Sequence, residues 1–235
     1  MSGHSKWATT HRQKAVVDAK RGAAFTKLGN MIAIAARGGT DPTTNSSLAL
    51  AIEKARAANM PNANIQRAID RINDKNAAAL EEAVYEGYYG PGGVGIIIET
   101  ATDNKNRTYP EVRTALTKNG GTMADSGSVM FQFARKGVIR VAASGEEALL
   151  TVLDAGAEDA TEEDGGLTVY TDKKELAKVR EALLAAGMTV EDAELQYVPN
   201  NTVAIEDDET ARKLTKIIDA LEALDDVTNV ATNAA

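Results

Sequence analysis

Between residues 24 and 73, apolar side chains recur at the three- and four-residue spacing of amphipathic helices. The stripes of three predicted helices are Phe25, Leu28, Ile32 and Ala35; Leu48, Ile52 and Ala55; and Ile65, Ala68, Ile69 and Ile72. Gly38 and Gly39 end the first helix, and Pro61 suits the first turn of the third. Three such helices can bury their stripes only against one another, so residues 1–78 are predicted to form a small bundle.

From residue 84 onward, apolar runs of strand length alternate with helical patterns. Strands are expected at residues 84–88, 93–100, 128–133, 138–142, 157–161, 167–171, 188–198, 202–206 and 227–231, and helices at 107–118, 146–155, 173–186 and 208–224. Residues 138–198 then follow the order β-α-β-β-α-β of a ferredoxin-like sandwich. Residues 93–133 and 202–231 each supply one β-α-β half of a second sandwich.

This pattern predicts an α+β fold, in which an N-terminal helical bundle is followed by two α/β (ferredoxin-like) domains, one inserted in the other. The predicted domains are residues 1–78, residues 79–135 together with 200–235, and the inserted residues 136–199. Neither half of the discontinuous domain can cover a sheet alone, so the two halves are expected to fold together.

Charge is divided by position along the chain. Residues 1–75 contain 12 Lys and Arg against 5 Asp and Glu, a net charge of +7, whereas residues 76–235 contain 14 against 29, a net charge of −15. A basic first domain on an acidic body attracts polyanions through one end. The rings of Trp7 and His11 lie among these cations and can stack on exposed bases. The alternative is a solvated basic helix face, although such faces usually mix both signs of charge.

The predicted nucleic-acid-binding residues all belong to this basic first domain. They are Lys6, Trp7, His11, Arg12, Lys14, Lys20, Arg21, Lys27, Arg56 and Arg71. No helix-turn-helix signature stands out in the sequence, so these residues predict phosphate contacts and base stacking with little sequence selection. The acidic α/β domains are expected to face away from the polyanion or toward a protein partner.

Signals of catalysis or cofactor binding are weak. Residues 90–95 match the pattern G-x-G-x-x-G, but a strand-like run follows where a dinucleotide site requires a helix, so a glycine-rich turn is expected. The chain has no cysteine and two histidines, and the acidic run 158–164 lacks the features of a calcium loop. We therefore expect no enzyme activity, metal, other cofactor or small-molecule substrate. No apolar run approaches ~18 residues, which predicts a cytoplasmic protein that does not associate with membranes.

Several longer motifs are typical of one known family. They include Gly3-His4-Ser5-Lys6-Trp7, Asp18-Ala19-Lys20-Arg21, Ala58-Asn59-Met60-Pro61, Tyr85-Glu86-Gly87, Gly90-Pro91-Gly92-Gly93, Thr102-Asp103-Asn104, Asn106-Arg107-Thr108 and Gly127-Ser128-Val129. On these motifs the chain resembles the YebC/PmpR family over essentially its whole length. The resemblance implies a helical first domain and two α/β domains. The pair Tyr88-Tyr89 departs from the family pattern by one added residue, and Phe131 stands where the family usually has Trp.

The resemblance also implies a role in gene expression, because the family includes bacterial proteins labelled transcriptional regulators and a mitochondrial translational activator of cytochrome oxidase. One function is DNA-binding regulation of transcription. The other is a ribosome-associated translation factor that binds ribosomal RNA and helps ribosomes through proline-rich stretches. A scaffold that binds only protein partners is the third alternative.

Overall fold

The computed structural model describes residues 18–74, 78–90, 93–163, 165–205 and 207–235. Its first part is a helical bundle, which we call the head, built from α2 (Asp18–Ala36), α3 (Ser46–Ala57), α4 (Asn62–Asp70) and the short 3-10 helix η2 (Arg71–Asn73). The side chain of Asn45 caps α3 by accepting a hydrogen bond from the backbone N–H of Leu48 at 3.1 Å. The predicted stripes meet in one core, which contains Ile32, Ile52 and Ile65, and this confirms the predicted bundle.

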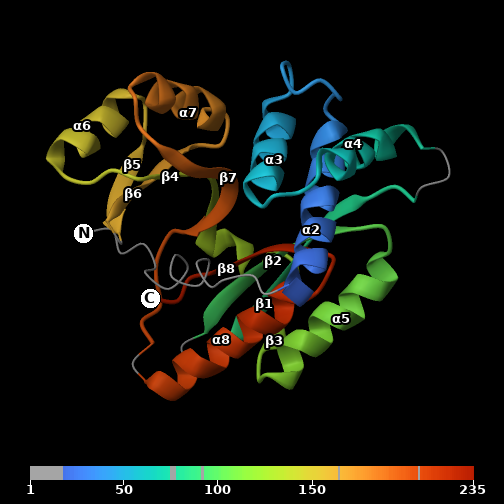
Figure 1. Ribbon diagram of the computed structural model, residues 1–235. Coiled ribbons are helices and arrows are strands. Elements are labelled where there is room, and N and C mark those ends of the chain that lie inside the picture. Colours follow the sequence, from blue (N-terminus) through green and yellow to red (C-terminus); the bar gives the residue numbers. More distant parts are fainter. Residues whose placement is uncertain (1–17, 75–77, 91–92, 164, 206) are drawn as a thin grey trace.

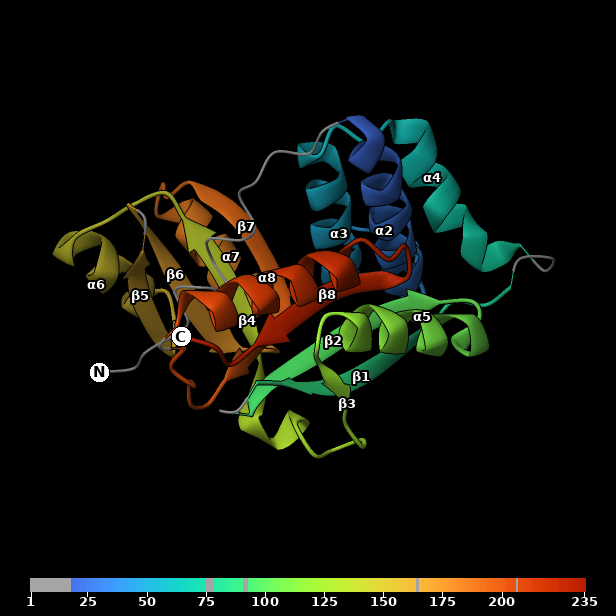
Figure 2. The ribbon, with the colours of Figure 1, turned by 90° about the horizontal axis from the view of Figure 1, so that it is seen from below.

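A four-stranded antiparallel sheet, sheet A, follows the head. Its strands are β1 (Glu81–Tyr89), β2 (Val94–Thr102), β3 (Thr122–Met123) and β8 (Val227–Thr232), in the order β3-β1-β2-β8. Helices α5 (Lys105–Lys118) and α8 (Asp208–Glu222) lie side by side on one face of this sheet (Figure 2). Ile96 and Ile98 of β2 pack there against Leu116 and Leu214. The opposite face carries a smaller cluster of Ile97 with other apolar residues.

The turn between β1 and β2 contains the glycine-rich motif. Gly90 and Gly93 both have positive φ, and the N–H of Gly93 donates to the carbonyl oxygen of Gly90 at 3.1 Å. The predicted glycine-rich turn is therefore correct. β1 and β2 pair without a bulge up to Tyr89 and Val94, so the added tyrosine extends the hairpin and buries its ring in the core of sheet A.

A second four-stranded antiparallel sheet, sheet B, is formed entirely between β3 and β8 of the chain. It contains β4 (Phe133–Val141), β5 (Asp159–Glu163), β6 (Gly166–Asp172) and β7 (Val190–Pro199), in the order β5-β6-β4-β7, with α6 (Glu146–Asp154) and α7 (Leu176–Ala185) on one face. This is the strand order of a ferredoxin-like sandwich, as predicted. The expected boundary between residues 135 and 136 falls inside β4, whose first residues already pair with β7.

Two predicted strands are wrong among the described residues. Residues 128–133 turn through a 3-10 helix, η3 (Met130–Gln132), before β4 begins, because Glu86 binds the backbone N–H groups of Val129 and Met130 that a strand would pair. Residues 202–205 form only an isolated bridge between Val203 and Ala234. The place beside β2 that the predicted strand would have taken is occupied by β1, which comes earlier in the chain. Sheet A therefore still has the ferredoxin-like strand order.

The head sits beside both sheets rather than apart from them. Helix α2 contacts β2 and β8 of sheet A, and α3 contacts β7 at the edge of sheet B. Figure 1 shows α2 running along sheet A while α4 lies on the side of the head away from α6 and α7. The basic and acidic parts of the chain therefore share an interface, and α4 is displayed away from sheet B.

Candidate nucleic-acid interface

The predicted binding residues nearest to the N-terminus cannot be placed. Lys6, Trp7, His11, Arg12 and Lys14 lie outside the described residues. Lys20 and Arg21 belong to the first turns of α2. The structure therefore positions the side chains of Lys27, Arg56 and Arg71 only.

Lys27 joins the head to the body of the protein. Its half-buried ammonium group donates a hydrogen bond to the carbonyl oxygen of Glu222, at the end of α8. Burial lowers the pKa of Lys27 below its ordinary value, although the charges of Glu222 and Asp225 act in the opposite direction. This cation already binds a carbonyl group of the protein.

Arg71 has a similar position on η2. Its guanidinium group lies 3.5 Å from the carboxylate of Asp103 and donates to the side-chain oxygen of Asn30 at 3.4 Å. The amide of Asn30 in turn donates to the carbonyl oxygen of Ala101 in β2 at 3.4 Å. Arg71 thus stabilises the contact between the head and sheet A, a role that helical periodicity did not indicate.

Two exposed cations of the described head lie on α3 and α4, and a third, Arg37, donates to the carbonyl oxygen of Leu80 at 3.2 Å. Arg56 is exposed near the end of α3, and Arg67 is exposed on α4, where it donates to the side-chain oxygen of Asn64 at 3.4 Å. Residues 58–61 connect these two helices, and Asn59 supplies the positive φ that the tight connection requires. Asn62 and Gln66 are also exposed on α4, so this helix presents side chains of the types that contact base edges.

The pair α3 and α4 has the connection length of a helix-turn-helix motif, and Figure 1 shows the two helices lying crosswise. No signature of this motif stands out in the sequence, and the turn contains Asn59 in place of the glycine that is often found there.

A polar network that sequence reasoning missed lies where β2, α5 and β8 meet. The carboxylate of Asp226 accepts hydrogen bonds from the hydroxyl groups of Thr102 at 2.9 Å and Thr108 at 2.6 Å, and from Arg107 at 2.7 Å. Burial alone would raise the pKa of Asp226, but these bonds and the charge of Arg107 together hold that pKa below its ordinary value. The only signal in the sequence was the pair of family motifs Thr102-Asp103-Asn104 and Asn106-Arg107-Thr108.

A second buried carboxylate fixes the segment before β4. Glu86 is 2% exposed and accepts backbone N–H groups of Gly127 at 2.6 Å, Val129 at 2.7 Å and Met130 at 2.8 Å. Burial alone would raise the pKa of Glu86, but the hydrogen bonds from the three N–H groups have the larger combined effect and hold that pKa below its ordinary value. The segment held in this way exposes Phe131, with 72% of its surface accessible.

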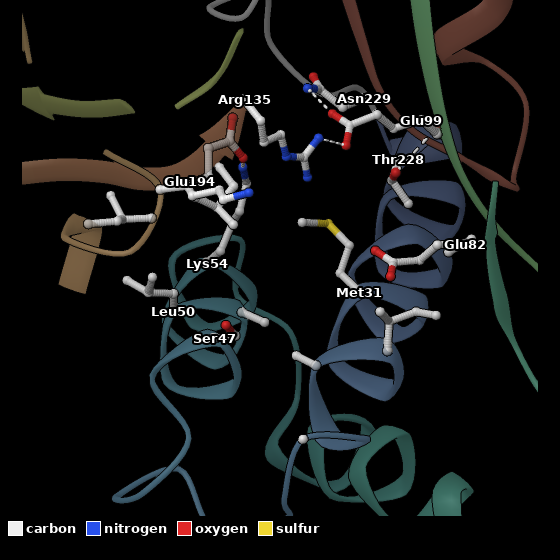
Figure 3. A pocket seen from close by; sticks show the side chains of 18 of the residues that line it. Met31, Ser47, Leu50, Lys54, Glu82, Glu99, Arg135, Glu194, Thr228 and Asn229 are labelled. Atoms are coloured by element: carbon white, nitrogen blue, oxygen red, sulfur yellow. Dashed lines mark hydrogen bonds and ion pairs between the residues drawn. The ribbon is translucent and has the colours of Figure 1, made fainter. Parts of the chain in front are cut away.

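A cleft of about 460 Å³, which we call the head cleft, separates the head from both sheets. Figure 3 shows Met31 of α2 and Lys54 of α3 reaching into it, opposite Arg135 and Glu194. Lys54 pairs with Glu194 and lies 3.6 Å from Asp192. Arg135 pairs with Glu99 and stacks over the ring of Tyr197, 4.6 Å from its centroid. The walls of the head cleft therefore combine apolar side chains with ion pairs that cross between domains.

Comparison with known proteins places the whole chain in one family. A family model described as the TACO1/YebC protein N-terminal domain matches residues 5–75, and a model of the TACO1/YebC second and third domain matches residues 80–234. The chain belongs to the TACO1/YebC family. This confirms the resemblance found in the sequence.

Other members of the TACO1/YebC family align with nearly the full chain. Relatives from Moorella thermoacetica and Chlorobaculum tepidum are each 51% identical, over 100% and 99% of this chain and 95% and 94% of their own lengths, and both are named "Probable transcriptional regulatory protein". A crystal structure of a conserved hypothetical protein from Aquifex aeolicus superposes with a TM-score of 0.90 at 44% identity, covering 98% of this chain and 97% of that one.

Among the residues that the structure describes, no group of three or more His, Asp or Glu side chains is arranged to hold a metal ion. No helix in the described part of the chain is long and apolar enough to cross a membrane. The two TACO1/YebC models meet between residues 75 and 80, between η2 and β1.

Proposed function

We propose that this protein is a non-enzymatic, cytoplasmic regulator of gene expression that binds nucleic acid and contacts phosphates through its head. The observation that carries the proposal is the division of charge, a net +7 over residues 1–75 against −15 over the rest. A polyanion approaching such a molecule is attracted to one end and repelled by the other. The names of the relatives as transcriptional regulatory proteins support the same class of function.

Duplex DNA is one candidate partner, and the outward face of α4 supports it. Asn62, Gln66 and Arg67 are exposed on the second helix of a closely connected pair. In DNA-binding proteins with such a pair, the second helix enters the major groove and its polar side chains contact base edges. Its place on the side of the head away from sheet B (Figure 1) keeps this face clear of the acidic inserted domain.

The ribosome is the alternative partner, and the spread of cations supports it. Arg56 and Arg67 lie on different helices, and Lys6, Arg12 and Lys14 add further charges to the head. A protein that docks among folded ribosomal RNA meets phosphates from several directions, which favours cations on more than one face. In this function the protein would relieve stalling of ribosomes at proline-rich stretches.

The salt dependence of binding tests the proposed interface. If six phosphates are contacted, the slope of log affinity against log salt concentration on duplex DNA is about −5, at roughly 0.9 per contact. A variant with Lys6, Arg12, Lys14, Lys20 and Arg21 changed to Gln is expected to flatten this slope. The matched control changes five exposed cations of α5 and α8 to Gln, namely Arg113, Lys118, Arg212, Lys213 and Lys216. Equal slopes for the two variants would refute the assignment to the head.

DNA and ribosome are distinguished by sequence preference and sedimentation. A transcription regulator discriminates between sequences because each wrong base pair costs about 1–3 kcal/mol. Binding to one promoter about a thousandfold tighter than to random DNA, without sedimentation with ribosomes, identifies the transcriptional function. Weak binding to all DNA together with co-sedimentation with ribosomes, and slowed translation of proline-rich stretches on gene deletion, identifies the translational one.

A further inference from the structure

Sheet B and its helices form the most acidic unit of the body, and most of their few cations are already paired. Residues 136–199 contain six Lys and Arg against 14 Asp and Glu, a net charge of −8. Four of the six form ion pairs: Lys136 with Glu158 at 3.2 Å, Arg140 with Glu191 at 3.3 Å, Lys178 with Glu175 at 3.0 Å, and Arg180 with Glu53. The remaining two are Lys173 and Lys174.

Lys173 and Lys174 are exposed in the connection between β6 and α7. Within the part of the chain that the structure describes, no carboxylate lies within ion-pair distance of either ammonium group. Both residues line the head cleft, whose other wall is α3 with Lys54. The two unpaired cations of an otherwise acidic unit therefore face the basic head across a shared cavity.

The charges inside the head cleft leave these lysines available to an anion. Its lining contains the cations Lys54, Arg135, Lys173 and Lys174 and the carboxylates Glu82, Glu99 and Glu194. Arg135 is neutralised by Glu99, and Lys54 by Glu194. The two exposed lysines then stand against the single exposed carboxylate of Glu82, so this cavity is locally positive in a region whose overall charge is strongly negative.

We propose that the head cleft binds the phosphates of single-stranded nucleic acid between Lys54 of α3 and the pair Lys173 and Lys174. This rests on the proposed function and adds a second contact surface to the head. A cavity of about 460 Å³ has the size of a small-ligand pocket, which admits one strand and excludes the width of a duplex. The apolar side chains of Met31 and Leu50 beside it offer the bases a surface out of water.

Glu194 occupies the place of a phosphate when no strand is bound. Its carboxylate pairs with Lys54 and also accepts a hydrogen bond from the amide of Gln196 at 2.5 Å. A phosphate entering the cleft exchanges with this carboxylate for the ammonium group of Lys54. Asp192 lies 3.6 Å from the same ammonium group. Removal of the charges of Glu194 and Asp192 is therefore expected to strengthen binding, whereas removal of Lys173 and Lys174 weakens it.

The test measures binding of oligouridylate and oligothymidylate of about 20 nucleotides across a range of salt concentrations. The variant Lys173→Gln with Lys174→Gln loses two phosphate contacts, so the magnitude of the log-log salt slope is expected to fall by about 1.4, at roughly 0.7 per single-strand phosphate. At 0.1 M salt this corresponds to about 25-fold weaker binding. The matched control is Lys178→Gln with Lys213→Gln, which removes two exposed lysines that pair with carboxylates of nearby residues outside the cleft. The double variant Glu194→Gln with Asp192→Asn is expected to bind about fivefold tighter at 0.1 M salt, because both carboxylates that pair with Lys54 are then neutral and Lys54 can bind one more phosphate.

The outcomes separate the two proposals. Equal affinity losses in the two double-lysine variants, or unchanged binding in Glu194→Gln with Asp192→Asn, overturn the head cleft as a strand site while the head remains the nucleic-acid interface. Absence of binding by the unchanged protein to any oligonucleotide, duplex or ribosome overturns both. A preference for oligouridylate over oligothymidylate identifies RNA as the strand, and the reverse preference identifies DNA.

Discussion

The carboxylate of Asp226 connects β8 to β2 and α5, and we predict that Asp226→Ala loosens this whole region. The side chain accepts hydrogen bonds from Thr102, Thr108 and Arg107, and both threonines are fully buried. A hydrogen bond to a charged group is worth about 1.5–3 kcal/mol. The contribution of Arg107 is smaller because its side chain is half exposed, and the two hydroxyl groups can still pair with each other at 2.7 Å. We expect a loss of about 3 kcal/mol.

Hydrogen exchange in the native protein measures this loss where it occurs. The backbone N–H of Ala101 donates to the carbonyl oxygen of Asp226 at 2.9 Å, so amides in β2 and α5 report on the contact. A loss of about 3 kcal/mol corresponds to roughly 100-fold faster exchange of these amides. Asp226→Asn retains the shape and one acceptor and is expected to lose about half as much. The control is Asp125→Ala, at an exposed carboxylate of the same domain.

The same contact gives the region a defined pH dependence. The pKa of Asp226 is lower in the folded protein than its ordinary value, so the unfolded chain binds the proton more readily. The stabilisation is therefore complete above the ordinary value of about 3.9 and is lost as pH falls through the folded-state pKa. Asp226→Asn removes this part of the acid sensitivity. Exchange rates in β2 and α5 that match those of the Asp125→Ala control at neutral pH, or the same acid sensitivity in Asp226→Asn, would refute the reasoning.

Three further changes test the packing. Gly137→Ala places a methyl group against the side chain of Thr171 and is expected to lower the free energy of unfolding in urea by about 1–3 kcal/mol. Gly22→Ala adds a methyl group in open space on α2 and is expected to raise the free energy of unfolding by about 0.5–1 kcal/mol. Glu86→Gln places an amide NH₂ donor against the backbone N–H donors that the carboxylate now accepts. The amides of residues 127–130 should then exchange at least tenfold faster, which corresponds to a loss of at least ~1.4 kcal/mol. Residues 133–199 contain all of sheet B with its helices and core. This fragment is therefore expected to unfold in one cooperative calorimetric transition. A broad, non-cooperative transition would show that the fragment does not fold independently.

Periodicity predicted those parts of the fold that depend on local burial. The stripes that contain Ile32, Ile52 and Ile65 each bury one face of a helix. A burial pattern of that kind is visible in the local spacing of apolar residues. The order of sheet B followed similarly from alternating helix and strand patterns. What failed was the segment around Val129, where an apolar run suggested a strand. Its backbone N–H groups bind a carboxylate more than 40 residues earlier in the chain, and no local pattern encodes such a partner.

The candidate interface was predictable as a region but not residue by residue. The excess of Lys and Arg indicated the head, yet it did not show which cations turn inward. Lys27 meets a carbonyl group 195 residues away, and Arg71 meets Asp103. The two lysines of the head cleft were hidden for the opposite reason. Lys173 and Lys174 belong to an acidic half of the sequence, and only the fold brings them opposite α3.

Fewer cations of the head are therefore available to a partner than the count along the sequence implies. Residues 1–75 contain 12 Lys and Arg, but Lys27, Arg37, Lys54 and Arg71 already bind carbonyl or carboxylate oxygens of the protein. The loss of these four contacts alone reduces the magnitude of the salt slope on duplex DNA by about 3.6, at roughly 0.9 per contact. Nucleic acid can use the inner four only by taking the place of the body's own oxygen atoms. The acidic body thus sets how much of the basic head is open to a partner.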